Sequence, residues 1–170
     1  LLGVYDNDFN ISKKAAHESG CKSYESFEKM IEEIDVLDIV TPTPSHYGYA
    51  LKAIEKGVHV FIEKPVCSNT KESFNLIEKS KLNNVKIQVG HVERFNAAFT
   101  AVENHISQPM FIESHRLAQF NPRGTDVSVV LDLMIHDIDI ILNSINSSIK
   151  HISSSGVSVI SETPDIANAR

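Results

Sequence analysis

The sequence is poor in cysteine, in clusters of basic residues and in long apolar runs, and each shortage excludes a class of protein. Its two cysteines, Cys21 and Cys67, are too few for a disulfide framework and show no Cys-x-x-Cys metal or redox spacing. No stretch concentrates Lys and Arg, and 22 acidic against 16 basic residues give a net charge of −6. We therefore expect no nucleic-acid partner. No apolar run approaches the roughly 20 residues that cross a bilayer, so we expect no membrane span.

What is present is typical of a globular protein. Of the 170 residues 42% are hydrophobic and 22% are charged, which is enough to bury one core or one and a half small ones. The opening run Leu-Leu-Gly-Val-Tyr-Asp has neither the basic start nor the small-residue cleavage site of a signal peptide. These features predict a cytoplasmic protein.

Residues 1–90 alternate short apolar runs with longer segments of helical periodicity. The expected strands are residues 1–5, 36–41, 59–63 and 86–90, and the expected helices are residues 12–19, 26–34, 46–56 and 71–82. This alternation predicts an α/β fold of the Rossmann type, in which helices cover a doubly wound parallel sheet. Ligands of such sheets bind at the carboxyl ends of the strands, so functional residues are expected there.

After residue 90 the pattern changes to that of an α+β domain with a mainly antiparallel sheet. We expect a helix at 96–105, a strand at 110–117, a loop at 121–125, a helix at 127–142 and a half-exposed strand at 150–160. Residue 1 lies inside an expected strand, and no closing element follows the last expected one. We therefore expect an incomplete dinucleotide-binding domain at 1–93 and an incomplete substrate and oligomerisation domain at 94–170.

Asp6 directly follows the first expected strand. A carboxylate at the end of the second strand of a dinucleotide-binding fold accepts hydrogen bonds from the adenosine ribose and repels a 2′-phosphate. Asp6 thus favours NAD over NADP, although for an acid taken alone a turn or cap role is the better explanation. The Gly-x-Gly-x-x-Gly turn that precedes this strand in such folds is not in the sequence.

The run Thr41-Pro42-Thr43-Pro44-Ser45-His46 follows the expected strand at 36–41. Its prolines hold the loop extended, so that it can lie flat beside a ligand. Taken alone, Ser45 is explained as a helix N-cap and His46 as a first-turn residue.

The next apolar strand ends in Glu63-Lys64-Pro65. Together with the upstream Thr-Pro-x-x-x-His run, this placement resembles the Gfo/Idh/MocA oxidoreductase family, whose hallmark is Glu-Lys-Pro. The resemblance implies that Lys64 hydrogen-bonds the reacting hydroxyl of the substrate. It further implies a set of cofactor-contacting residues: Asp6, Thr41, Pro42, His46, Glu63, Lys64 and Gly90.

The resemblance continues through Gly90-His91-Val92-Glu93-Arg94-Phe95-Asn96, which matches the family's crossing into the second domain. Arg94 and Asn96 are therefore candidates to bind hydroxyl or phosphate groups of the substrate. The alternative for Arg94 is a surface or interdomain ion pair. Ala97 stands where the family usually has proline.

Asp132 and His136 form the strongest catalytic candidate. Four residues apart on a helix, they share one face and can hold each other, above a buried stripe formed by Leu131, Met134, Ile135, Ile138 and Leu142. A near-neutral histidine can take a proton from a hydroxyl while a carboxylate stabilises the resulting imidazolium. The resemblance to the family implies that His136 is the base and that Asp132 assists it. No third metal ligand lies nearby in sequence, so we expect no metal.

Residues 122–137 resemble the branch of the family that includes UDP-N-acetylglucosamine 3-dehydrogenases. Many relatives carry glycines before the aspartate, whereas this chain has Asp-Val-Ser-Val-Val at 126–130, which should narrow the pocket. The resemblance implies a dehydrogenase that oxidises a secondary hydroxyl of a sugar or nucleotide sugar. The alternatives are a cyclitol or free-sugar dehydrogenase and a non-catalytic nucleotide or sugar sensor. It also implies a homo-oligomer paired through the second-domain sheet.

Overall fold

The computed structural model describes residues 1–106, 108–119 and 127–170. The chain divides into two compact units. The first consists of residues 1–41, 45–62 and 69–88, and the second of residues 42–44, 63–68 and 89–170. Because the positions of these parts relative to one another are not determined, each unit is described by itself.

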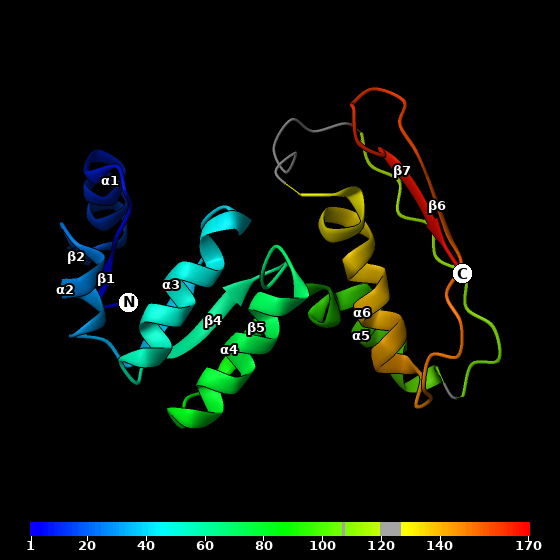
Figure 1. Cartoon of the computed structure of the whole chain (residues 1–170), viewed down its shortest axis with the longest axis horizontal. Helices are drawn as coiled ribbons and strands as arrows, with labels where there is room; N and C mark the ends of the chain where they lie inside the picture. The colour runs from blue at the N-terminus through cyan, green and yellow to red at the C-terminus, as the bar shows by residue number, and fades with distance from the viewer. Residues whose placement is uncertain (107, 120–126) are drawn as a thin grey trace. The chain divides into compact units, whose positions relative to one another are not determined.

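Strands and helices alternate through the first unit, as the sequence predicts (Figure 1). The strands are β1 (Gly3–Val4), β2 (Lys22–Ser23), β3 (Val36–Ile39), β4 (His59–Glu63) and β5 (Ile87–Gly90), and the helices are α1 (Phe9–Ser19), α2 (Phe27–Ile31), α3 (Thr43–Glu55) and α4 (Thr70–Leu82). Parallel strands β1 and β2 form one sheet, and β3, β4 and β5 form a second. The predicted Rossmann-type α/β architecture is confirmed. Only β2, two polar residues long, was not predicted.

Local chemistry explains where these helices begin and end. Asp8, Ser26 and Asn69 each accept a backbone N–H of the first turn of α1, α2 and α4, as N-cap side chains do. Helix α1 is followed by the C-cap Gly20, whose φ of 65° is a left-handed conformation that glycine adopts without steric cost. The expected N-cap at Ser45 is wrong, because α3 already begins at Thr43.

Strand β4 lies in the middle of the three-stranded sheet and pairs in parallel with β3 from Val36↔His59 to Ile39↔Ile62. Its Val60 and Ile62 are buried, and so are Leu37 and Ile39 on β3. Ala50, Ala53 and Ile54 of α3 are fully buried as well. This apolar packing determines the direction in which β4 delivers the residues that follow it.

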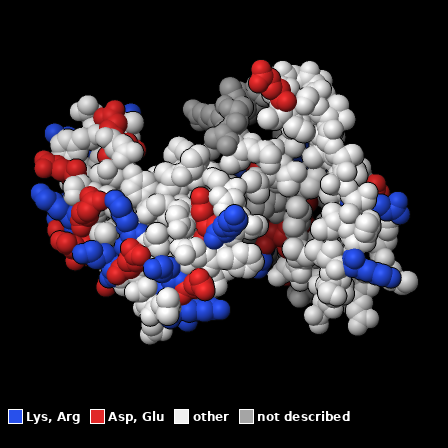
Figure 2. All heavy atoms as spheres, viewed as in Figure 1, with Lys and Arg blue, Asp and Glu red and all other residues white. Residues whose placement is uncertain are grey.

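Charged side chains intermingle on the surface of the first unit. On the face shown in Figure 2, Lys and Arg alternate with Asp and Glu over the helices. Ion pairs link neighbouring helices, with Lys52 Nζ 2.9 Å from Glu28 and Lys79 Nζ 3.5 Å from Glu55. Because both pairs are exposed, they contribute little to stability.

The second unit contains short helices and an antiparallel pair of strands. The pieces are η1 (Val92–Phe95), α5 (Ala97–Val102), η2 (Glu103–His105), the π-helical turn η3 (Val130–Met134), α6 (Ile135–Ser144), β6 (Ser154–Val157) and β7 (Ile166–Ala169). Strands β6 and β7 lie side by side, with Ser154 opposite Ala169 (Figure 1). The small antiparallel sheet predicted for this half is confirmed.

Three expectations for the second unit need correction. The strand expected at 110–117 is absent, because no strand of the described chain pairs with this segment. The stripe expected to be buried is only partly so: Leu131, Met134 and Ile135 are half-buried, but Ile138 is 38% and Leu142 51% exposed. The helix expected at 127–142 begins at Val130 as a π turn, and the loop expected at 121–125 lies outside the described residues. Among the described helices, none is long and apolar enough to cross a membrane.

Candidate active site

Lys64 stands immediately after β4 and turns its ammonium toward the turn that precedes α6. Its Nζ donates to the Asp132 carboxylate at 3.0 Å and to the Asp132 backbone carbonyl at 2.7 Å. The Lys64 side chain is 20% exposed and that of Asp132 is 36% exposed. The Lys64–Pro65 peptide bond is cis, and Pro65 is buried. The predicted Lys64 and Asp132 thus meet within the second unit as a hydrogen-bonded ion pair.

His136 lies in the first turn of α6, half-buried. Its Nδ1 is shielded from solvent and has no hydrogen-bond partner in the described chain. Burial lowers the pKa of His136 below its ordinary value, and the positive charges of Lys64 and Arg116 lower it further. The imidazole is therefore uncharged at neutral pH, the form that can accept a proton.

The expected contact between Asp132 and His136 does not form. Asp132 lies in the π turn η3, whereas His136 lies in α6. A π turn closes hydrogen bonds from i to i+5, so residues four apart across it do not stack as they do on an α-helix. Across the described residues, the carboxylate of Asp132 bonds to Lys64 and not to His136.

Arg116 and Asp137 are residues near His136 that the sequence analysis missed. Arg116 Nε donates to Asp137 Oδ2 at 2.8 Å and Nη2 to Oδ1 at 3.2 Å, while Ser114 Oγ donates to Oδ1 at 2.9 Å. Burial raises the pKa of Asp137, but the hydrogen bonds from Arg116 and Ser114 outweigh it and leave the value below its usual range. The only sequence signal was Asp137 directly following His136, and nothing in the sequence pointed to its partner.

Arg94, a predicted substrate ligand, is engaged with a buried carboxylate. Its Nε donates to Asp139 Oδ2 at 2.7 Å and its Nη2 to Oδ1 at 2.5 Å. Asp139 is 9% exposed, and His91 Nδ1 lies 3.9 Å from its Oδ1. The hydrogen bonds from Arg94 lower the pKa of Asp139. This geometry is the ion pair that the sequence left open as the alternative for Arg94.

Asn96, the other predicted substrate ligand, caps α5. Its Oδ1 accepts the Ala98 N–H at 3.0 Å, and its Nδ2 donates to Glu93 at 3.2 Å. The side chain is exposed and therefore accessible to a ligand, which would compete with the weak hydrogen bond from Nδ2 to Glu93.

The residues predicted to contact a cofactor follow the strands. Asp6 and Thr41 come after β1 and β3 in the first unit, whereas Glu63 and Gly90 end β4 and β5 and belong to the second. His46 is 1% exposed and its Nε2 donates to the Thr41 carbonyl at 2.7 Å. The preferred interpretation of His46 as a first-turn residue agrees with this position. Pro42 directly precedes α3.

Asp6 has the properties that a nicotinamide dinucleotide requires at its adenosine ribose. The side chain is exposed, and its Oδ1 accepts the Asp8 N–H at 2.8 Å, which orients the carboxylate and leaves Oδ2 for a ribose hydroxyl. The residues present therefore fit the group. In the part of the chain that the structure describes, no group of three His, Cys, Asp or Glu is arranged to hold a metal ion.

Comparison with known proteins agrees with this architecture. The sequence model of the Gfo/Idh/MocA oxidoreductase family, described as an NAD-binding Rossmann fold, matches residues 1–91. UDP-N-acetylglucosamine 3-dehydrogenase of Acidithiobacillus ferrooxidans is 33% identical over 99% of this chain and 54% of its own length. Its solved structure superposes with a TM-score of 0.92 over 99% of this chain and 56% of the solved one. A scyllo-inositol 2-dehydrogenase (NAD(+)) of Bacillus subtilis is 29% identical over 85% of this chain and 46% of its own.

Parallel strands alternating with helices, followed by a small antiparallel sheet, define a dinucleotide-binding protein with a second, α+β part. The chain belongs to the Gfo/Idh/MocA oxidoreductase family. It spans about half the length of the curated relatives that it matches.

Proposed function

We propose that this protein is an NAD-dependent dehydrogenase that oxidises a secondary hydroxyl of a sugar, with Lys64, Asp132 and His136 as its catalytic group. The observation that carries the proposal is the ion pair between Lys64 and Asp132, at 3.0 Å, beside a helix whose His136 has a buried nitrogen without a hydrogen-bond partner among the described residues. A protein that only binds a ligand needs no uncharged proton acceptor and no held ammonium in one site. This combination favours catalysis over the non-catalytic alternative.

Each of the three residues has a distinct role in this proposal. Bound NAD supplies the acceptor for the hydride that leaves the carbinol carbon. His136, uncharged at neutral pH, takes the hydroxyl proton. The Lys64 ammonium donates a hydrogen bond to the same oxygen and stabilises the negative charge that develops on it. Asp132 holds the ammonium in place through its carboxylate and its backbone carbonyl.

For the substrate, we propose a nucleotide sugar such as UDP-N-acetylglucosamine. Support comes from the relative of that activity, which resembles this chain along nearly its whole length. The second candidate is a cyclitol or free sugar, which the similarity to the scyllo-inositol enzyme favours. Arg94 and Asn96 remain proposed substrate ligands, although Arg94 would have to share its guanidinium with Asp139.

We further propose a dinucleotide-binding domain at 1–93 and a substrate and oligomerisation domain at 94–170. The family match to residues 1–91 is consistent with the first of these. For homo-oligomer formation through the β6–β7 sheet, support comes from the exposed apolar side chains of Val157 and Ile166, 56% and 59% exposed. The low cysteine content, Cys21 and Cys67 alone in the sequence, suits a cytoplasmic location.

The experiment is steady-state kinetics on the full-length protein with UDP-N-acetylglucosamine and a panel of free sugars and inositols. Lys64→Ala should lower turnover on the best substrate by about 10²-fold or more while the melting temperature stays near that of the wild type. Lys64→Arg should not restore turnover, because a planar guanidinium does not fit the site of a compact ammonium.

The matched control is Lys71→Ala, which removes an exposed lysine from α4 and should leave the rate unchanged. Near-normal turnover in Lys64→Ala would overturn the catalytic assignment. If the wild type turns over no member of the panel yet binds one of them, the sensor alternative becomes the better account.

A further inference from the structure

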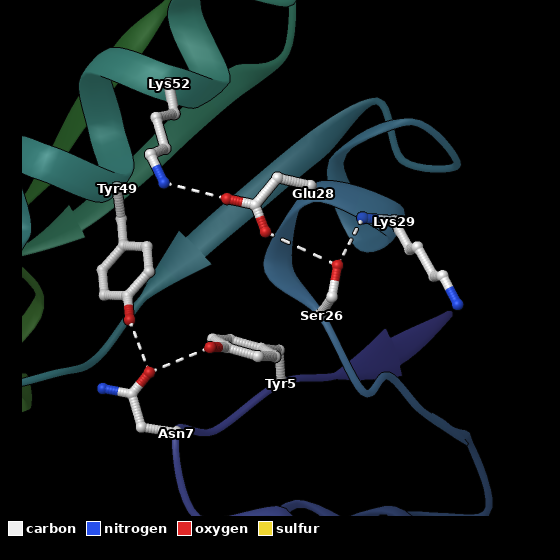
Figure 3. A network of polar contacts seen from close by, with 7 residues as sticks. All are labelled: Tyr5, Asn7, Ser26, Glu28, Lys29, Tyr49 and Lys52. Atoms are coloured by element: carbon white, nitrogen blue, oxygen red, sulfur yellow. Dashed lines mark hydrogen bonds and ion pairs between the residues drawn. The ribbon is translucent and has the colours of Figure 1, made fainter.

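Beyond Asp6, one polar side chain at the end of β1 is held in a single orientation. The Oδ1 of Asn7 accepts two hydrogen bonds, from the hydroxyl of Tyr5 at 2.9 Å and from the hydroxyl of Tyr49 at 3.0 Å. Figure 3 shows both rings converging on this oxygen, with Nδ2 directed away from them. Because hydroxyls that donate to Oδ1 require the carbonyl on that side, the amide is fixed with its N–H groups outward.

The two tyrosines are themselves anchored. Both rings pack against Phe27, with ring centroids 5.9 Å apart for Tyr5 and 4.7 Å apart for Tyr49, and Phe27 is 4% exposed. The bond from Lys52 on α3 to Glu28 on α2, at 2.9 Å, joins the helices that carry Tyr49 and Phe27 (Figure 3). The hydroxyl pair thus rests on a packed aromatic cluster and not on an exposed loop.

The Nδ2 of Asn7 is the unused half of this arrangement. Asn7 is exposed, and both of its side-chain hydrogen bonds within the described residues go to Oδ1, which leaves Nδ2 without a hydrogen-bond partner there. Its neighbour Asp6 is also exposed and offers an acceptor, Oδ2, oriented by the Asp8 N–H. Consecutive residues therefore present one acceptor and one donor, both oriented before any ligand binds.

A ribose diol has the complementary chemistry. Each hydroxyl donates one hydrogen bond and accepts others, so a vicinal pair is best bound by a carboxylate that accepts and an amide that donates. Resting on the proposed function, which places the adenosine ribose at Asp6, we propose that Asn7 is a cofactor-contacting residue. Its Nδ2 donates to a ribose hydroxyl, and Tyr5 and Tyr49 are positioning residues that keep the amide from turning over.

The decisive variant is Asn7→Asp. A carboxylate keeps both bonds from the tyrosine hydroxyls but replaces the outward donor with an acceptor. We expect the Kd for NADH, measured by fluorescence titration of the full-length protein, to rise roughly 10-fold or more, because the outward donor is lost and a second negative charge stands next to that of Asp6. Asn7→Ala should raise it about 3- to 10-fold, the loss of one hydrogen bond.

The positioning role has its own test. Tyr5→Phe combined with Tyr49→Phe keeps the ring packing and removes both hydroxyl donors, which frees the amide to rotate. This variant should weaken NADH binding by about 2- to 5-fold while Asn7 itself is intact. Adding Asn7→Ala to this double variant should weaken NADH binding by less than Asn7→Ala does in the wild type. Independent structural effects would not produce such a coupling.

Asn10→Asp is the matched control, since it adds the same charge at an exposed position in the first turn of α1 and should leave the Kd unchanged. Thermal melts show that each variant is folded. If the wild type binds NADH and both Asn7→Asp and Asn7→Ala bind it with the same Kd, this inference alone is overturned. If the wild type bound neither NADH nor NADPH, the proposed function would fail first and this inference with it.

Discussion

Two of the three proposed catalytic side chains, Lys64 and His136, depend on their surroundings in opposite ways. Lys64 is held by a partner, since Asp132 binds its ammonium through two oxygens. His136 is poised by the lack of one, because its Nδ1 is buried and unpartnered in the described chain. An ammonium must be in place to stabilise charge, whereas a base must keep a free lone pair. The difference in their contacts agrees with the different roles proposed for them.

Replacing His136 tests the proposed base directly. His136→Asn should lower kcat by about 10²- to 10⁴-fold with little change in NADH affinity, because the imidazole takes a proton but does not bind the cofactor. In the wild type, the acid limb of the kcat/KM profile should have its midpoint below 6.5, since burial and neighbouring cations lower the pKa of His136. The variant should lose that limb.

The control for this experiment is His151→Asn, an exposed histidine of the second unit. It should keep both the rate and the acid limb. An equal loss of cofactor affinity in His136→Asn would instead assign this residue a structural role.

At the scale of elements, the segment η3–α6 connects much of the second unit. Three of its carboxylates each bind a cation from a different part of the chain: Asp132 binds Lys64, Asp137 binds Arg116, and Asp139 binds Arg94. Two of these pairs are bidentate, so they constrain direction as well as distance. His136 lies among them, and its position is therefore determined by contacts that other residues make.

Breaking one of these pairs should destabilise the unit in a pH-dependent way. The hydrogen bonds of Arg94 are the main cause that lowers the pKa of Asp139 below 3.8. The ion pair therefore contributes its full stability above pH 3.8. This contribution is lost as the pH falls through the lowered pKa of Asp139 in the folded state. Arg94→Gln should cost about 1–2 kcal/mol at neutral pH, an amount reduced by the partial exposure of the guanidinium.

Chemical denaturation across the acid range measures this effect. The difference between wild type and Arg94→Gln should shrink as the pH drops below 3.8. Lys14→Gln, which removes a cation from the exposed pair with Glu18 at 4.0 Å, should change stability by less than about 0.5 kcal/mol. A pH-independent difference for Arg94→Gln would contradict the ion-pair explanation.

For the whole molecule, the family and the strand-end residues point to one cofactor class, and we propose that Asp6 discriminates between NAD and NADP. We expect the full-length protein to bind NADH more tightly than NADPH, because the exposed carboxylate repels a 2′-phosphate. Asp6→Ser should narrow the ratio of the two Kd values, mainly by improving NADPH binding. Glu18→Gln, a neutralised exposed acid on α1, is the control. Tighter NADPH binding by the wild type would refute the preference.

The strand order and most helices of the first unit were predictable from the sequence. Strand β4 was predicted with its observed ends, because it is a short continuous apolar run that is followed by a proline, Pro65. With Asp8 and Asn69 as N-caps, α1 begins a few residues before its predicted start and α4 begins one residue before its predicted start. In the second unit the prediction was poorer. A segment at 110–117 with strand-like composition forms no strand, since a strand exists only when another strand pairs with it.

The sequence by itself determined the fold class, the placement of Lys64 after a buried strand and the presence of Asp132 and His136 near one helix. These follow from local periodicity and chain direction, which act over a few residues. Only the tertiary structure decided the partners: Asp132 with Lys64 and not His136, Arg116 with Asp137, and two tyrosines on Asn7. Apart from the contact between Tyr5 and Asn7, which are two residues apart, each of these contacts joins residues distant in the chain. Such contacts depend on packing between elements, which spacing along the sequence does not encode.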